Sequence, residues 1–187
     1  DEELPNAQLP IKGLGDWAIV STSEPYSLSS MWEGRTRSDY YKVSFATGER
    51  TLISEADYAA DRLSATGKYV GTYNATDSCW YTINLADNRK IKLTTPQTFP
   101  AWDEDNDVPN YPSPHGMAGW VKGDAALLIY DRYDIWAFDP EGKTAPVMLT
   151  NNGRENKVTY RRVVVDREQV DIDLKEPMLM TGFNEVD

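Results

Sequence analysis

The 187-residue sequence is poor in the two side chains on which many catalytic and metal sites depend, since it holds one cysteine and one histidine. A single thiol excludes an intrachain disulfide and any zinc site built from several cysteines. Cys79 lies in the strand-like run Cys-Trp-Tyr-Thr-Ile, so we expect a buried, unreactive thiol. The number of cysteines therefore indicates neither a redox function nor a cell compartment.

The sequence also lacks the motif that would mark a hydrolase nucleophile. No G-x-S-x-G segment occurs in the chain. The only histidine, His115, lies in the segment Tyr-Pro-Ser-Pro-His-Gly, with no nucleophile motif beside it. We therefore expect His115 to pack or form a hydrogen bond within a loop, and we assign no catalytic or cofactor-binding residue and no cofactor.

Positive charge and long apolar runs are scarce as well. The chain has 19 Lys and Arg against 30 Asp and Glu, a net charge of −11. Such a chain repels phosphate backbones, which disfavours a nucleic-acid partner. No stretch approaches the ~20 apolar residues of a membrane span. The 40% of apolar residues is ordinary for a globular domain.

What the sequence does have is a repeated pattern of short strands and turns. Its best copy has two apolar runs, residues 125–130 and 135–138, around the polar group Asp-Arg-Tyr-Asp, then a Pro-Glu-Gly-Lys turn and a third run at residues 147–150. Strand-forming residues separated by turn formers predict three antiparallel strands. Weaker copies of this unit occur twice earlier in the chain.

The earlier copies have strands predicted at residues 17–22, 39–45 and 50–53, and at 69–73, 79–85 and 90–94. Their closing strands contain Leu52, Leu93 and Leu149, and residues 96–119, with five prolines, lengthen the last interval. A repeat of about 40 residues with several short strands is typical of propeller blades, which bury both faces by stacking. We therefore expect an all-β fold, a partial β-propeller of about three blades of antiparallel strands. The chain is predicted to be a single non-catalytic propeller segment, residues 1–187, with blade-like repeats at 14–54, 64–95 and 119–150 and an incomplete blade at 158–187.

The remaining segments are predicted to be irregular. Residues 1–12 are a polar lead-in, residues 23–37 a Ser-rich loop, residues 54–62 a connector with weak helical character, and residues 96–119 an insertion.

An acidic run, residues 103–107, resembles the start of a calcium loop. The match then fails, because Val108 stands in place of the required glycine and Pro114 in place of the bidentate glutamate. We expect a solvated acidic loop and no metal. Paired carboxylates for glycoside hydrolysis remain an alternative, but the sequence does not single out a pair.

Arg132, between Asp131 and Asp134, has two interpretations. It could present its guanidinium to a carboxylate ligand at one end of a blade. It could also pair with Asp131, with Asp134 or with an adjacent blade, and this structural interpretation is the one we favour.

The copies resemble the propeller repeats of prolyl oligopeptidase-like serine peptidases and of TolB-type proteins. The matching pieces include Ser-Ala-Thr-Gly-Lys at residues 64–68, Leu93-Thr94, residues 134–139 and Leu149-Thr150. Three stretches together are similar to the propeller of large peptidases of this family from Bacteroides-type bacteria. They are residues 32–41, with Trp-Glu-Gly and Arg-Ser-Asp-Tyr-Tyr, residues 103–120, and Leu-Ile-Tyr-Asp-Arg-Tyr-Asp-Ile-Trp at 128–136.

The resemblance implies a parent enzyme in which a propeller gates or orients peptide substrate for a hydrolase domain that carries Ser, Asp and His. This chain would then be no enzyme by itself, with the hydrolase domain and peptide substrate as its partners, in a bacterial periplasmic or secreted protein. The adjacent glutamates Glu2 and Glu3 lack the motif of the amine-binding pair of dipeptidyl peptidases. An open set of blades exposes its outermost faces, so we also expect the isolated segment to self-associate.

Two further hypotheses stay open. A TolB-like protein- or carbohydrate-binding module would use the loop aromatics Tyr26, Trp32, Trp102 and Tyr111. A small glycosidase would need a close carboxylate pair in a cleft.

Overall fold

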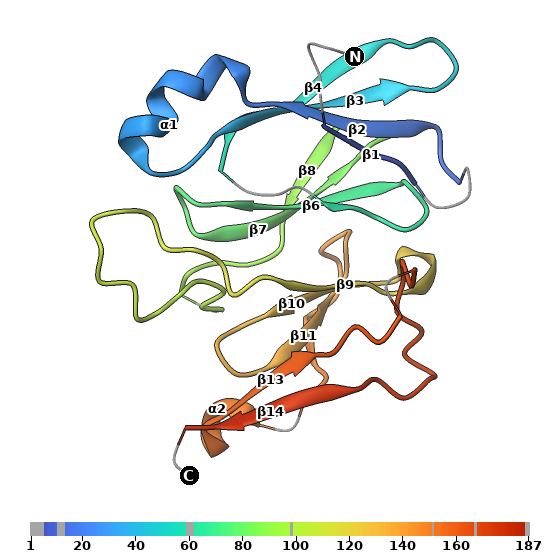
Figure 1. Ribbon diagram of the computed structural model, residues 1–187. Helices are drawn as coiled ribbons and strands as arrows, with labels where there is room; N and C mark the ends of the chain where they lie inside the picture. The colour runs from blue at the N-terminus through green and yellow to red at the C-terminus, as the bar shows by residue number, and fades with distance from the viewer. Residues whose placement is uncertain are drawn as a thin grey trace.

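The computed structural model describes residues 6–10, 14–58, 62–97, 99–150, 152–166 and 168–185. These residues form four antiparallel sheets that follow one another along the chain (Figure 1). The fold is all-β, as the sequence predicted. Glu2, Glu3 and part of the predicted lead-in and connector lie outside the described residues.

The first three sheets have four strands each, and each strand pairs with the next one in the chain. Sheet I contains β1 (Asn6–Gln8), β2 (Trp17–Thr22), β3 (Ser38–Ser44) and β4 (Arg50–Asp57). Sheet II contains β5 (Arg62–Leu63), β6 (Tyr69–Asn74), β7 (Cys79–Asn84) and β8 (Arg89–Lys92). Sheet III contains β9 (Met117–Trp120), β10 (Leu127–Tyr130), β11 (Ile135–Phe138) and β12 (Val147–Met148), and sheet IV contains β13 (Val158–Arg162) and β14 (Met180–Asn184).

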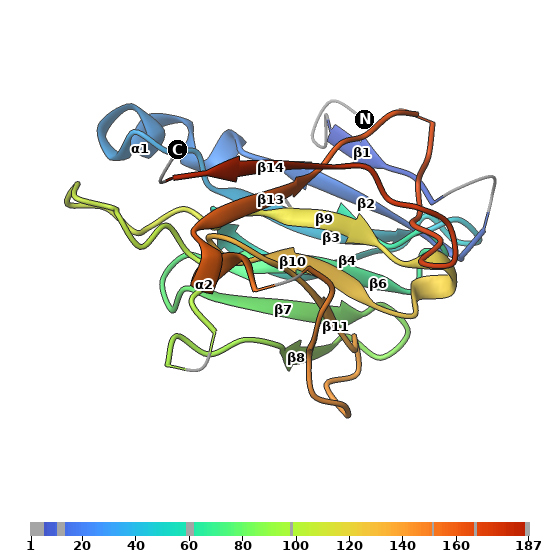
Figure 2. The same ribbon diagram turned by 90° about the horizontal axis from the view of Figure 1, so that it is seen from below.

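The sheets stack in chain order (Figures 1 and 2), with one apolar core between sheets I and II and another between sheets II and III. A third core lies on the other face of sheet III, where Ile172 and Met178 of the connection between β13 and β14 pack against it. Strand β10 shows how one strand serves two cores. Leu127 and Ile129 belong to the core shared with sheet II, whereas Leu128 and Tyr130 belong to the core on the opposite face. Successive side chains of a strand point to opposite faces, so a strand between two sheets is apolar at consecutive positions.

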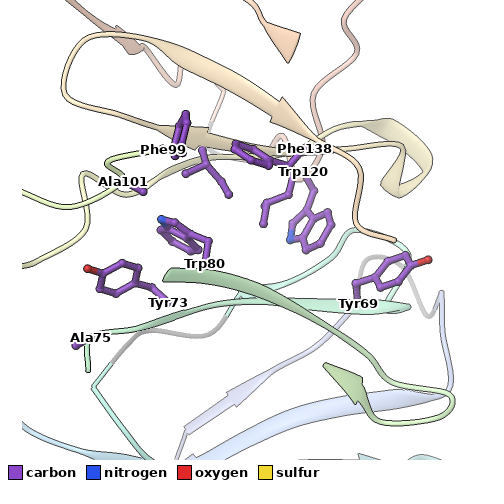
Figure 3. Close-up of a cluster of buried hydrophobic side chains, with 10 residues drawn as sticks. Tyr69, Tyr73, Ala75, Trp80, Phe99, Ala101, Trp120 and Phe138 are labelled. Carbon is purple, nitrogen blue, oxygen red and sulfur yellow. The ribbon is translucent and has the colours of Figure 1, made fainter. Parts of the chain in front are cut away.

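The core between sheets II and III is rich in aromatic rings (Figure 3). Tyr69 stacks on Trp120, with ring centroids 6.1 Å apart, and Phe99 meets Phe138 edge to face at 5.1 Å. At Gly71, in the middle of β6, a Cβ atom would lie 3.0 Å from Cδ2 of Leu127. The absence of a side chain there lets the two sheets approach closely.

The irregular segments contain more structure than the sequence predicted. Strand β1 lies in the expected lead-in, β4 extends into the expected connector, and β9 begins inside the expected insertion. Each of β1, β5 and β9 is the first strand of its sheet and has two to four residues. Runs this short carry no detectable alternation, and they become strands because the neighbouring strand offers its edge.

The predicted Ser-rich loop at residues 23–37 contains a helix, α1 (Ser27–Glu33), after a short 3-10 turn, η2 (Glu24–Tyr26). Pro25 in that turn suits the start of a helix, and Gly34 ends α1 with φ 67° while its N–H donates to the carbonyl of Ser30 at 3.1 Å. Two other short helical segments are η3 (Lys122–Asp124) and α2 (Gly153–Asn156). No described helix has the length and apolar character of a membrane-spanning segment.

Candidate functional site

Cys79 and His115, the two reactive side chains of the sequence, are both held within the fold. The Cys79 thiol is fully buried and donates to the carbonyl of Asp77 at 3.0 Å, and burial raises its pKa. The His115 backbone N–H donates to the carbonyl of Ala101 at 3.1 Å, while burial and then the charge of Arg161 lower the imidazole pKa. Among the described residues no hydrogen bond joins this imidazole to a hydroxyl or thiol.

The acidic run at residues 103–107 is engaged by arginines and backbone groups. The Glu104 carboxylate accepts hydrogen bonds from both terminal nitrogens of Arg154, at 3.2 and 2.9 Å. The Asp105 carboxylate accepts one from Arg132 at 2.9 Å. Asp103 accepts the N–H of Asp105 at 3.1 Å and so shapes the loop. Within the described ranges no three His, Cys, Asp or Glu side chains converge as a metal site would require.

Arg132 joins the acidic loop to sheet IV. Besides Asp105, its guanidinium donates to Glu185 at 3.2 Å and lies beside the ring of Tyr133, 5.3 Å from the centroid. Hydrogen bonding to Asp105 raises the Arg132 pKa further above its ordinary value. Neither Asp131 nor Asp134 is a partner of Arg132; of the partners considered from the sequence, the contact is made with the neighbouring sheet.

Asp131 and Asp134 instead fix the backbone around them. Asp131 accepts the N–H groups of Tyr133 and Asp134, at 2.7 and 2.6 Å. Asp134 is fully buried and accepts from the Thr150 hydroxyl at 2.6 Å and from the N–H groups of Gly153 and Arg154 at 2.8 and 3.1 Å. The two aspartates between β10 and β11 therefore stabilise the connection between these strands and the chain around Gly153.

Two carboxylates at the other end of sheet III reach across to sheet II. Asp124, only 4% exposed, accepts from the Ser64 hydroxyl at 2.7 Å and from the Thr66 N–H at 3.2 Å. Glu141 accepts from the Tyr69 hydroxyl and from Arg89, and these two partners lower its pKa to about 2. Neither role has a signal in the local sequence, because each partner lies more than fifty residues away.

A cavity of about 490 Å³ lies at the edge of the stack that carries α1 (Figure 1), next to the residues that follow this helix. Its wall is formed by the connections next to sheet I, by sheet II and by the chain around the start of β9, and it includes Arg35, Tyr58, Arg62, Tyr73, Trp80 and Met117. Its size is within the range of small-ligand pockets. Figure 3 shows Tyr73 and Trp80 side by side at this edge of the core.

The cavity wall combines aromatic surface with positive charge. The guanidinium of Arg35 donates to the Ser113 hydroxyl at 3.2 Å. The Tyr58 hydroxyl donates to Glu33 at 2.9 Å and that of Tyr73 to the carbonyl of Pro112 at 3.2 Å, and burial raises the pKa of both phenols. No Asp, Glu or Lys belongs to the described lining, so its formal charge comes from arginine.

The four loop aromatics predicted for a binding module differ in exposure. Trp32 on α1 is 89% exposed and Tyr111 is 44% exposed. Trp102 packs partly buried against the core between sheets II and III, and the Tyr26 hydroxyl donates to Asp39 at 2.5 Å, which raises the Tyr26 pKa to about 12. Of these four aromatics, Trp32 and Tyr111 therefore present open ring surface.

Sequence reasoning did not identify the cavity, because its arginines and rings come from several distant segments and form no motif. A comparison with models of protein families and with curated proteins found no match to the chain.

Proposed function

We propose that the chain is a run of β-propeller blades that acts as the non-catalytic part of a prolyl oligopeptidase-like serine peptidase, where it gates or orients peptide substrate for a hydrolase domain. The observation that carries this proposal is the repetition of one strand order in sheets I, II and III, stacked in chain order with a core between each pair. Blades of a propeller repeat in this way and depend on their neighbours for burial.

Two further observations support the proposal. The Asp-Arg-Tyr-Asp-Ile-Trp stretch that resembles the family lies between β10 and the start of β11, where its carboxylates fix the fold and its arginine reaches the next sheet. The described residues also form a cavity at one edge of the stack, where sheet II meets the connections next to sheet I and the start of β9. A gating role needs an end surface of this kind and needs no catalytic group.

The coding sequence on either side of this segment provides the first test. We expect a G-x-S-x-G motif in the same reading frame, and an open reading frame without any hydrolase domain would refute the peptidase assignment.

Activity provides the second test. The whole encoded protein is expected to cleave peptide reporters, including aminoacyl-proline reporters, whereas the isolated chain is expected to be inactive. Turnover by the isolated chain that a serine-directed inhibitor abolishes would show that the chain is itself an enzyme. The control for contaminating peptidases is the whole protein in which the serine of the G-x-S-x-G motif is replaced by alanine.

A TolB-like protein- or carbohydrate-binding module is the alternative, and the exposure of Trp32 and Tyr111 favours it. Exposed aromatic rings are a common means of contact at binding surfaces. This alternative predicts glycan-array binding that Trp32→Ala abolishes, with Trp102→Phe as a control because Trp102 packs against the core.

A further inference from the structure

We propose that the cavity at the α1 end of the stack binds a small ligand that has a single carboxylate and an apolar or aromatic body. The proposal rests only on the cavity and its wall, whichever enzyme the blades belong to. Two sources of this chemistry are the C-terminal carboxylate of a peptide and a free organic acid.

Arg35 and Arg62 provide the positive charge. Arg35 makes a hydrogen bond to a neutral hydroxyl, and Arg62 is an exposed residue at the start of β5. In the described part of the chain neither of them makes an ion pair, although Arg89, Arg132 and Arg154 all do. In a protein of net charge −11, two arginines without carboxylate partners at one cavity leave a locally positive site.

The shape of the guanidinium group indicates which anion fits. Its planar fork of donors matches a carboxylate, with two parallel N–H···O bonds. A phosphate would bring a second negative charge against the overall field of an acidic protein, and no lysine of the described lining would compensate it. A monoanion is therefore the better ligand.

The remaining wall indicates what the carboxylate is attached to. Tyr73, Trp80 and Met117 contribute carbon surface, and the protons of the Tyr58 and Tyr73 hydroxyls are already donated to Glu33 and to the carbonyl of Pro112. Apolar surface of this kind favours an aliphatic or aromatic group over a sugar. Specificity would thus come from the two arginines of the wall together with its hydrophobic surface.

Titration calorimetry of the 187-residue chain tests for the carboxylate site. The four ligands are N-acetyl-Ala-Phe, its C-terminal amide, 3-phenylpropionate and phenyl phosphate. We expect saturable binding of at least one free carboxylate and none of the amide. Binding of the dipeptide alone would identify a peptide terminus as the source, and binding of phenylpropionate as well would identify a general organic-acid site; either supports the proposal. Equal binding of acid and amide, tighter binding of phenyl phosphate, or no saturable carboxylate binding up to about 10 mM would overturn it.

Variants locate the site. Arg35→Gln and Arg62→Gln should each weaken carboxylate binding about ten- to hundredfold, because each removes a charge-assisted hydrogen bond. The lysine variants at these positions should recover only part of the affinity, since a point charge does not form the two-pronged contact. Lys175→Gln removes the same charge at an exposed residue outside the cavity lining and should bind as the parent does.

Unchanged circular dichroism and thermal melting would show that the glutamine variants fold. Parent-like affinity in both would refute the site even if the parent binds carboxylates. Such a failure would leave the proposed propeller function standing, because that function depends on strand order and stacking.

Discussion

Replacement of Asp134 by alanine should remove one of the strongest anchors of the third sheet. The carboxylate is fully buried and receives three hydrogen bonds, from the Thr150 hydroxyl and from the backbone N–H groups of Gly153 and Arg154. The Thr150 hydroxyl can turn to another acceptor, but the two backbone groups cannot. A buried donor left without an acceptor costs about 1–3 kcal/mol, which applies in full to the buried Gly153 and in part to the partly buried N–H of Arg154. We therefore expect the free energy of unfolding to fall by about 3 kcal/mol.

Urea unfolding followed by tryptophan fluorescence and by circular dichroism measures this loss. With a denaturant slope of about 2 kcal/mol per molar urea, the midpoint should fall by about 1.5 M. Coincidence of the two probes would establish that the stack unfolds as one unit and that the free energies can be compared. Asp134→Asn should lie between the parent and Asp134→Ala, because its amide oxygen can accept from Gly153 while its NH₂ group faces the N–H of Arg154.

Asp107→Ala is the matched control, since Asp107 is an exposed aspartate in the acidic loop. Its stability should stay within about 0.5 kcal/mol of the parent. If Asp134→Ala behaves like this control, the carboxylate is not the structural anchor that its hydrogen bonds indicate. A functional role for the Asp-Arg-Tyr-Asp stretch would then have to be considered again.

Three further substitutions test Glu141 and Gly71, which lie between sheets II and III, and Phe183, which lies on the exposed sheet IV. Glu141 has a folded-state pKa of about 2, below its unfolded value near 4.5, so its stabilisation is present above pH 4.5 and is lost as the pH falls through about 2. Glu141→Gln should therefore be less stable than the parent at pH 7 and equal to it near pH 2, and a constant difference in urea midpoints would contradict this. Phe183, 67% exposed on sheet IV, should promote self-association that rises with concentration in light scattering and weakens in Phe183→Ser; a strictly monomeric parent would refute it. Gly71→Ala should lower the unfolding free energy by about 1–3 kcal/mol, because its Cβ would press on Leu127, and an unchanged thermal midpoint would show that the sheets can separate without cost.

The strands that could be predicted from the sequence are those in the middle and at the closing edge of sheets I to III. Apart from β12, which has two residues, they are runs of four to eight residues, and the central ones, such as β7 and β10, are rich in apolar and aromatic side chains with turns on both sides. A strand of two residues such as β5 has no such composition and exists only because β6 offers an edge. Helix α1 was missed because its apolar residues point into solvent, with Leu28 and Met31 both 79% exposed, and serine makes up three of its seven residues.

The cavity could not be predicted at all. Tyr58 follows the last strand of sheet I, Arg62 begins sheet II and Met117 begins sheet III, so the site exists only once the sheets are stacked. Periodicity and motifs describe neighbours along the chain, whereas this site depends on neighbours across sheets. The structural role of Arg132 could be predicted, because a guanidinium between two turn-forming aspartates indicates an ion pair within the fold. Its actual partners, Asp105 and Glu185, could not be predicted, because they are distant in the sequence.

The positions of the charged groups explain how the sheets stack in one arrangement. Apolar burial supplies most of the stability but is non-directional, so it cannot by itself fix how far one sheet slides along the next. Asp124 precedes β10 and Asp131 follows it, so these residues mark opposite ends of the strand.

At the first end Asp124 and Glu141 bind groups of sheet II, and at the other end Arg132 binds Glu185 after β14. Polar links at both ends, each to a different neighbour, fix the sliding position and the order of the sheets. The cavity depends on that position, because Arg35 lies between α1 and β3 whereas Arg62 begins β5 of sheet II. Loss of the polar links should thus disturb carboxylate binding before it unfolds the apolar cores, and Asp124→Ala, assayed for both, would show whether it does.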